Sequence, residues 1–249
     1  SSDLLTITDY PGDAWYVTDE MRQDGSQIEA LHTARATEGN RAFQEHFETR
    51  FLNTMNAGQT AGDGNIVNGF RHRFRAGGTN QTLLEEDYID MRLAFDKANV
   101  AMGGRIAIVD PVSAAALSKT ATLTANMDAV GESFRLAKDG FDREHQFVTM
   151  LHGWQIWTSN RLPSISGETL TLFDGTSSAS TSGVANIFMS MADDNAKPGM
   201  VAWRSLPSVE TQRDMDKRRD KFTMAGRFGI GVQRLDTLGV IVSSATATE

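Results

Sequence analysis

Apolar side chains recur at helical spacing along residues 26–55, the longest regular stretch of the sequence. Four large ones are spaced four residues apart, at Phe43, Phe47, Phe51 and Met55. Residues four apart lie on one face of an α-helix, so the pattern predicts a helix with a narrow apolar ridge that packs against another element. Ser26 and Glu29 have the spacing of an N-terminal capping box. At 1.5 Å per residue the helix is about 45 Å long, and we interpret it as a spine.

Shorter patterns after this helix predict alternating helices and strands. Thr82 and Glu85 are spaced as a second capping box, which predicts the start of a helix whose first-turn acids complement the helix dipole. The β-branched run at 105–109 predicts a buried strand. Asp110 before Pro111 has the order of an N-cap and a first helical residue, so a further helix is expected there.

Strand patterns dominate the second half of the chain. Residues 147–158 predict two strands around a tight turn at His152 and Gly153. Further strands are predicted at 184–192, 200–206, 222–234 and 237–244.

Polar segments separate these strands. Residues 164–183 are rich in Ser, Thr and Gly and predict an exposed flap, whereas 120–144 predict short helical pieces. Residues 210–221 mix both charges and predict a solvated or interface-facing connector. Gly229 and Gly231 lie inside a predicted strand, which indicates a bulge or a close approach of another backbone segment.

The first 25 residues predict a ribbon with little core of its own. Strands are expected at 4–7 and 15–17, and a polar stretch then leads into the long helix. The chain does not begin with Met, and we expect that residues upstream were cleaved or left out.

The charge balance argues against a dedicated nucleic-acid binder. The formal charge is −8, from 24 Lys and Arg against 32 Asp and Glu, and an acidic surface repels phosphate backbones. Arg71, Arg73 and Arg75 alternate as in a strand and could form a phosphate-binding patch. We favour a solvated edge strand, because acidic residues dominate elsewhere.

The sequence offers little that could be an active site. It contains no Cys, so thiolate metal sites and disulfides are excluded, and no apolar run approaches the roughly 20 residues of a membrane span. The five histidines follow no metal-binding spacing. His145, with Asp142 and Glu144 beside it, is the one candidate for hydrolytic chemistry, and a surface histidine is the more frequent interpretation. We expect no catalytic, cofactor-binding or metal site.

Four segments, in this order, resemble the major capsid protein of tailed double-stranded DNA bacteriophages, in particular podovirus-like and marine-phage coat proteins. They are DAWYVTDEMRQDGSQIEA at 13–30, LAFDKANVAMGGRIAIVDPVSAAAL at 93–117, FVTMLHGWQIWTSNRLP at 147–163 and SVETQRDMDKRRDKFTMAGRFGIGVQRLDTLGVI at 208–241. The resemblance spans nearly the whole chain. It implies an α+β protein of the Hong Kong 97-like capsid fold, with a spine helix, a peripheral domain and an axial domain built on a mixed sheet.

The resemblance also implies a domain map. Residues 1–25 would be the return ribbon of a partial extended loop that reaches over a neighbouring subunit. Residues 26–79 and 191–249 would form the peripheral domain, with the spine helix at 26–55, and 80–190 the axial domain.

The function implied is structural and not enzymatic. Many copies would assemble as pentamers and hexamers into an icosahedral shell that encloses the phage DNA without sequence-specific binding. The implied partners are portal and scaffolding proteins, with cement or decoration proteins as a further option, and no membrane. The implied location is the virion capsid, assembled in the host bacterial cytoplasm. Two alternatives stay open: an encapsulin-like cellular shell protein of the same fold, and an α/β hydrolase using His145.

Overall fold

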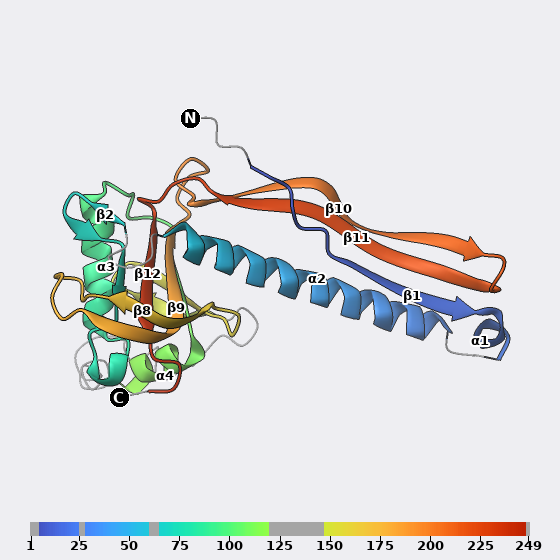
Figure 1. Ribbon diagram of the computed structural model, residues 1–249, viewed down its shortest axis with the longest axis horizontal. Coiled ribbons are helices and arrows are strands. Elements are labelled where there is room, and N and C mark those ends of the chain that lie inside the picture. The colour runs from blue at the N-terminus through green and yellow to red at the C-terminus, as the bar shows by residue number, and fades with distance from the viewer. Residues whose placement is uncertain (1–4, 25–27, 60–64, 120–146, 248–249) are drawn as a thin grey trace. The chain divides into compact units, whose positions relative to one another are not determined.

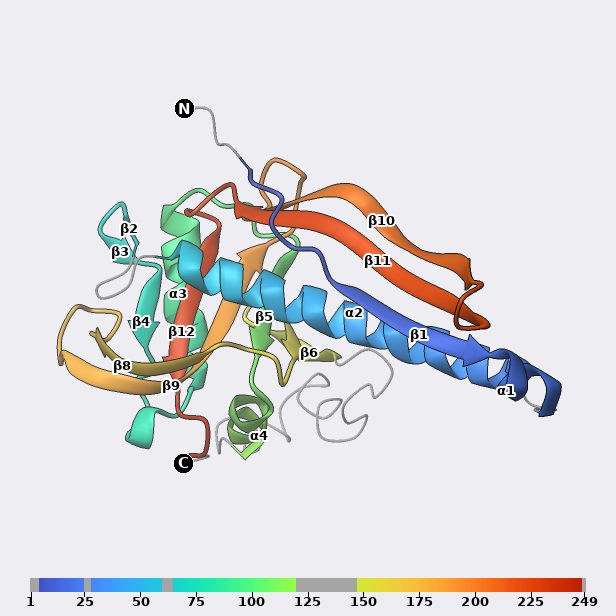
Figure 2. The ribbon, with the colours of Figure 1, turned by 45° about the vertical axis from the view of Figure 1, so that its right-hand side comes forward.

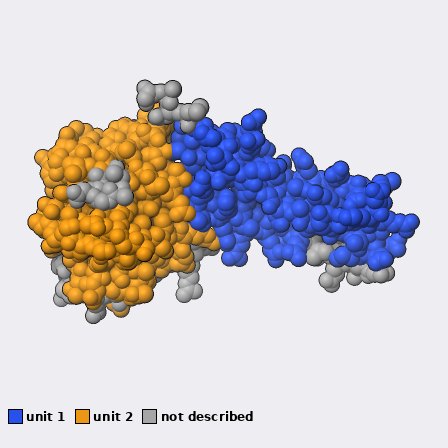
Figure 3. All heavy atoms as spheres, in the orientation of Figure 1, with its two compact units in different colours: residues 1–51, 200–231 blue, residues 52–199, 232–249 orange. Residues whose placement is uncertain are grey.

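A computed structural model describes residues 5–24, 28–59, 65–119 and 147–247 of the chain. The chain divides into two compact units (Figure 3). Unit 1 consists of residues 1–51 and 200–231, and unit 2 of residues 52–199 and 232–249. Each unit therefore consists of two segments that are separated in sequence.

Unit 1 combines a long helix with a three-stranded sheet (Figures 1 and 2). Its elements are β1 (Gly12–Thr18), α1 (Asp19–Asp24), α2 (Ile28–Gly58, in unit 1 as far as Phe51), β10 (Gly199–Asp214) and β11 (Arg219–Val232). The strand order is β1-β11-β10, and β1 runs antiparallel to β11 with Trp15 opposite Phe222.

Helix α2 confirms the predicted spine and ends three residues later than expected, at Gly58. The capping box at Ser26 and Glu29 lies outside the described residues. Gly39 is buried within the helix, where a Cβ would lie 3.3 Å from Met224 Sδ. A close neighbour thus compensates for the weak helix propensity of this glycine.

Unit 2 is built on a mixed seven-stranded sheet of order β4-β12-β9-β5-β7-β6, with β8 also paired to β9. Its strands are β4 (Arg73–Arg75), β5 (Arg105–Val109), β6 (Phe147–Leu151), β7 (Trp154–Thr158), β8 (Ser164–Leu170), β9 (Ala179–Ser190) and β12 (Leu238–Ser243). The other described elements of unit 2 are two helices, a 3₁₀ turn and a small hairpin. They are α3 (Glu85–Lys97), α4 (Pro111–Lys119), η1 (Thr79–Gln81), and β2 (Ile66–Val67) with β3 (Phe70–Arg71). Pairs β5/β7 and β4/β12 are parallel, and the other described ladders are antiparallel.

An aromatic core fixes α3 in unit 2. Trp154 of β7 meets Phe95 of α3 and Phe188 of β9 edge to face, each with ring centroids 5.0 Å apart. The Trp154 indole N–H donates to the backbone carbonyl of Tyr88, 3.1 Å away. Buried Arg105 donates to Asp96 at 2.7 Å and lies over the rings of Phe95 and Trp154. A buried charge that is both paired and stacked is compatible with this core.

A buried amide links the sheet to the start of α4. The Asn186 side chain on β9 accepts a hydrogen bond from the backbone N–H of Asp110 at 2.9 Å and donates to Ile241 O and Ser243 Oγ on β12. Asp110 in turn accepts from the Val112 N–H at 3.0 Å, which confirms the predicted N-cap before Pro111.

Several local predictions are confirmed. Strands β6 and β7 join through His152 and Gly153, whose φ values are 49° and 86°, as a tight hairpin turn requires. Gly229 and Gly231 permit a close backbone approach, because a Cβ on Gly229 would lie 2.7 Å from Thr6 O and one on Gly231 2.7 Å from a Leu5 methyl group. The segment predicted at 120–144 lies outside the described residues.

The predicted first strand and the two predicted polar loops are wrong. Residues 5–8 form no strand, because they pass beside Gly229 and Gly231, and β1 pairs with β11 instead. The segment 164–183 is exposed at many positions, as predicted, but it is not an irregular flap: β8 pairs with β9, and Leu170 and Thr181 are buried. The charged stretch 210–221 is not a connector, because it forms the paired ends of β10 and β11 and the turn between them.

The predicted solvated arginine strand is also wrong. Strand β4 lies at an edge of the sheet, but Arg73 is buried. Its guanidinium donates to Glu168 of β8 at 2.7 Å and to Asn56 of α2 at 3.0 Å. Within unit 2, this arginine therefore ties the end of α2 to the sheet.

The capping box predicted at Thr82 and Glu85 is wrong, because the observed one lies two residues later, at Leu84 and Asp87. Helix α3 begins at Glu85, and Asp87 provides the carboxylate that accepts from the backbone N–H of Leu84 at 2.8 Å. The same carboxylate accepts from the Gly77 N–H at 3.0 Å. Burial raises the pKa of Asp87 to about 6, with smaller contributions from Asp90 and Glu86.

We predict that Asn186→Leu destabilises unit 2 by about 2–4 kcal/mol, because buried groups on β12 and α4 lose their hydrogen-bond partner. The free energy of unfolding of unassembled protein, from urea titration, measures the effect. Asn195→Leu, on an exposed turn, is the matched control. Equal unfolding midpoints for the two variants would contradict the prediction.

We predict that Asp87 makes stability fall as pH rises from about 4 to about 6. Its pKa in the folded state, about 6, exceeds the 3.8 of an unperturbed Asp, so in this window the folded protein retains a proton that the unfolded chain has lost. The contribution is on the order of 3 kcal/mol and is constant above about pH 7. Asp87→Asn should remove it from unfolding titrations at several pH values. Exposed Asp193→Asn should keep the wild-type slope, and the same slope in Asp87→Asn would count against this assignment.

Candidate assembly surface

An aromatic cluster joins α2 to the sheet of unit 1. Phe47 stacks on Trp203 of β10 with centroids 5.5 Å apart and meets Phe228 of β11 edge to face at 5.2 Å. Phe43, one turn earlier, stacks on the same Trp203 at 6.1 Å. The predicted ridge of α2 therefore packs against the two long strands, which orients both strands along the helix.

Gly226 allows the ridge to approach the strands closely. A Cβ at this position of β11 would lie 2.8 Å from the Phe43 ring, closer than a side chain can be placed without displacing the ring. The lack of a side chain at Gly226 thus lets the Phe43 ring of α2 pack directly on β11.

Strand β10 lies at the edge of the described sheet and is exposed along most of its 16 residues. Large apolar side chains on it reach solvent: Leu206 is 69% exposed, Val209 49% and Trp203 40%. Pro207, in the middle of the strand, lacks the N–H that continuous edge pairing requires. A long edge strand with apolar side chains is typical of a surface that another chain covers.

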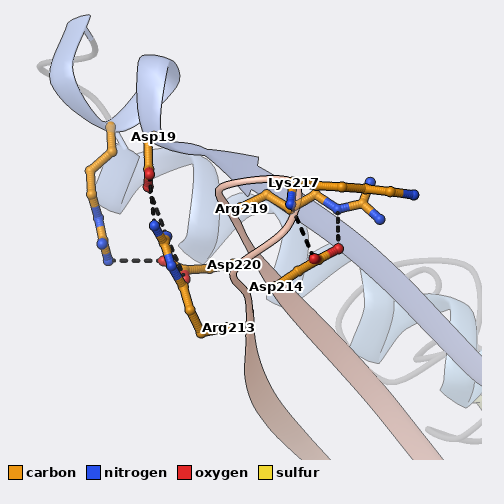
Figure 4. A network of polar contacts seen from close by, with 7 residues as sticks. Asp19, Arg213, Asp214, Lys217, Arg219 and Asp220 are labelled. Carbon is orange, nitrogen blue, oxygen red and sulfur yellow. Dashed lines mark hydrogen bonds and ion pairs between the residues drawn. The ribbon is translucent and has the colours of Figure 1, made fainter.

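Ion pairs connect the tip of the β10–β11 hairpin to α1 (Figure 4). Arg213 of β10 binds both carboxylate oxygens of Asp19, at 2.7 and 2.6 Å, and also donates to Asp220 of β11 at 3.0 Å. Arg22 of α1 reaches the second oxygen of Asp220 at 3.1 Å. Two arginines and two carboxylates thus connect segments that are almost 200 residues apart in the chain.

The charges of this network stabilise one another. The hydrogen bond from Arg213 lowers the pKa of Asp19, and Arg22 and Arg218 act in the same direction. Asp19 and Asp220 raise the pKa of Arg213 in turn. Beside them, Arg219 pairs with Asp214 at 3.0 Å and lies 3.9 Å above the ring of Tyr16.

A sequence model of the phage capsid protein family matches residues 2–243 of the chain. The chain belongs to the phage capsid protein family. Comparison with curated proteins gives no match. As a major capsid protein it is a subunit of the virion shell.

Solved structures show the same fold at low sequence identity. The capsid of Cyanophage P-SCSP1u aligns with a TM-score of 0.67 at 14% identity, over 97% of this chain and 74% of that one. Mycobacterium phage Che8 gives 0.61 at 17% identity, over 95% and 71%. The holo-SrpI encapsulin complex from Synechococcus elongatus gives 0.62 at 13% identity, over 95% and 74%. The α+β, Hong Kong 97-like fold expected from the sequence is confirmed.

The histidines of the capsid protein have packing or turn contacts where they are described. His145, Asp142 and Glu144, on which the hydrolase alternative depends, lie outside the described residues, as does the side chain of His32. The His46 ring meets Phe228 at 6.3 Å. Buried His72 stacks on Phe95, and burial lowers its pKa. His152 bonds Glu85 at 2.7 Å, which ties the β6–β7 turn to α3.

In the part of the capsid protein that the structure describes, no three acidic or histidine side chains are grouped so as to hold a metal ion. None of the described helices is long and apolar enough to cross a membrane. The sequence did not predict the ion pairs around Arg213, because residues 210–221 were expected to form a connector. The signal was present, because Arg213 and Asp220 flank a polar turn between two strand patterns, as cross-strand ion pairs do.

We predict that Phe47→Asp prevents the capsid protein from folding unit 1 and from forming shells. A carboxylate facing Trp203 and Phe228 has no partner there, and burying it costs several kcal/mol. Soluble yield and sedimentation of particles measure the outcome. Gln44→Asp, on the exposed side of α2, should behave as wild type. Particles formed equally well by both variants would show that the aromatic cluster is dispensable.

Proposed function

We propose that many copies of this capsid protein assemble as pentamers and hexamers into a closed icosahedral shell around the double-stranded DNA of a phage. The observation that carries the proposal is the family match over residues 2–243. The long apolar edge of β10 and the thin core of unit 1 support it, because a subunit that functions alone rarely leaves such a strand uncovered.

The domain map of the shell subunit belongs to this proposal. Residues 26–79 and 191–249 form the peripheral domain, 80–190 the axial domain, and 1–25 the return ribbon of the extended loop. The long α2 with β10 and β11 supports a peripheral domain built on the spine. The two compact units divide the chain elsewhere, since residues 52–79, 191–199 and 232–249 cluster with unit 2.

The protein acts without catalysis, and its assembly takes place in the cytoplasm of the host bacterium. Portal and scaffolding proteins, and optionally cement or decoration proteins, are its partners in this scheme. The net charge of −8 supports a wall that encloses DNA without sequence-specific binding, since an acidic protein does not condense on a phosphate backbone.

A cellular shell of the same fold is the alternative, because the encapsulin complex aligns with a TM-score of 0.62, close to the 0.61 of Mycobacterium phage Che8 and below the 0.67 of Cyanophage P-SCSP1u. An encapsulin-like shell would enclose a protein cargo. The content of the particle therefore separates the two candidates.

We predict closed shells, hundreds of ångströms across, when the complete gene is expressed together with its scaffolding protein. Electron microscopy and sedimentation detect the particles, and nuclease-protected DNA in infected cells distinguishes a phage capsid from a protein-filled compartment. His145→Ala should leave the yield of shells unchanged. A soluble monomer or dimer under these conditions would refute the shell function, and an enzymatic activity lost in His145→Ala would favour the hydrolase alternative.

A further inference from the structure

The ion network at the hairpin tip lies where the chain reverses direction from β1 to α2. Helix α1, between them, has six residues, which is too short to be stable in isolation. Its described main-chain contact with the hairpin is the Asp19 N–H, which donates to Arg218 O at 3.0 Å. The ladder of β1 with β11 reaches Thr18, so backbone contacts place the first residue of α1, and beyond it we attribute the attachment of the helix to side chains.

Arg213 is the centre of that attachment. Its guanidinium binds Asp19 through two parallel N–H···O bonds, the geometry in which arginine holds a carboxylate in a fixed direction. The third bond, to Asp220, connects the same guanidinium to the neighbouring strand. Asp220 is 9% exposed and also pairs with Arg22 of α1, so α1 is tied to the hairpin by two bonds at Asp19 and by one ion pair at Arg22.

We propose that Arg213 is the positioning residue of an ionic latch, formed with Asp19, Asp220 and Arg22, that holds α1 on the β10–β11 hairpin. The latch fixes the direction of the ribbon of residues 5–24 on the β10–β11 hairpin, and shell assembly depends on this direction. The role of this direction in assembly rests on the proposed shell function, whereas the attachment of α1 by the latch does not.

The latch is sensitive to salt. The side chains of Asp19, Arg213 and Arg22 are 30%, 38% and 63% exposed, so dissolved ions reach them. Screening over a Debye length of about 10 Å at 0.1 M and about 3 Å at 1 M weakens such pairs. The twofold contact at Asp19 keeps the latch closed at moderate salt, and high salt releases α1.

Hydrogen exchange at the amides of residues 19–24 tests the latch without requiring assembly. Arg213→Met keeps an unbranched side chain of similar length and removes the charge. Exchange at these amides should be at least about tenfold faster in this variant at about 0.1 M salt, and wild type should approach the same rate near 1 M. Arg204→Met, an exposed arginine on the same strand, is the matched control and should leave the exchange unchanged.

A charge swap distinguishes the latch from a general loss of stability. Asp19→Arg alone should release α1, and Asp19→Arg combined with Arg213→Asp should restore protection at residues 19–24 and the yield of shells. The unfolding midpoint of unit 2 should be the same in all variants. Shell yield in Arg213→Met should fall about fivefold or more at about 0.1 M salt.

The outcomes are separable. Wild-type exchange at residues 19–24 in Arg213→Met, or no recovery in the double variant, overturns the latch. Fast exchange combined with a normal yield of shells overturns its role in assembly. If wild type itself forms no shells, the proposed function fails, while the exchange experiment still decides whether the latch exists.

Discussion

The packing of one narrow ridge of α2 against two long strands is the constraint on which unit 1 depends. Helix α2 belongs to unit 1 as far as Phe51 and presents one stripe, with Phe43 and Phe47, to the strands. The sheet likewise gives one face to the helix. Most of what remains in the described part of unit 1 is edge and open face, so this unit has a small core for its length.

Unit 2 differs from unit 1 in the extent of its core. Its sheet carries a continuous core around Trp154, and the buried polar groups of Asn186 and Arg105 have partners in several elements. A fully paired polar network in a core disfavours alternative arrangements, because any shift leaves a group unpaired. In unit 1, by contrast, the aromatic cluster around Trp203, the stack of Trp15 on Phe222 and ion pairs with partly exposed side chains accompany the strand ladder.

The sequence predicted those elements whose cause is local. The ridge of α2, the turn at His152 and the N-cap at Asp110 each depend on a few neighbouring residues. It failed where a distant partner decides. Thr82 and Glu85 have the spacing of a capping box, but Gly77 and Leu84 offer their N–H groups to Asp87. Arg73 was expected in solvent, and Glu168, which is 95 residues away in the chain, binds it in the interior.

The assembly surface was predictable as a class of function but not as a set of residues. The ordered resemblance pointed to a shell subunit, whereas Arg213 and Asp19 are 194 positions apart and acquire a role only when β1 lies beside β11. Ion pairs between solvent-exposed side chains are individually weak, so this network adds little to the stability of the fold. The two parallel hydrogen bonds from Arg213 to Asp19 instead fix the direction of the chain at the start of α1. For a subunit that must meet identical copies at set angles, direction matters more than stability, because an interface repeated around a closed shell repeats any error in angle.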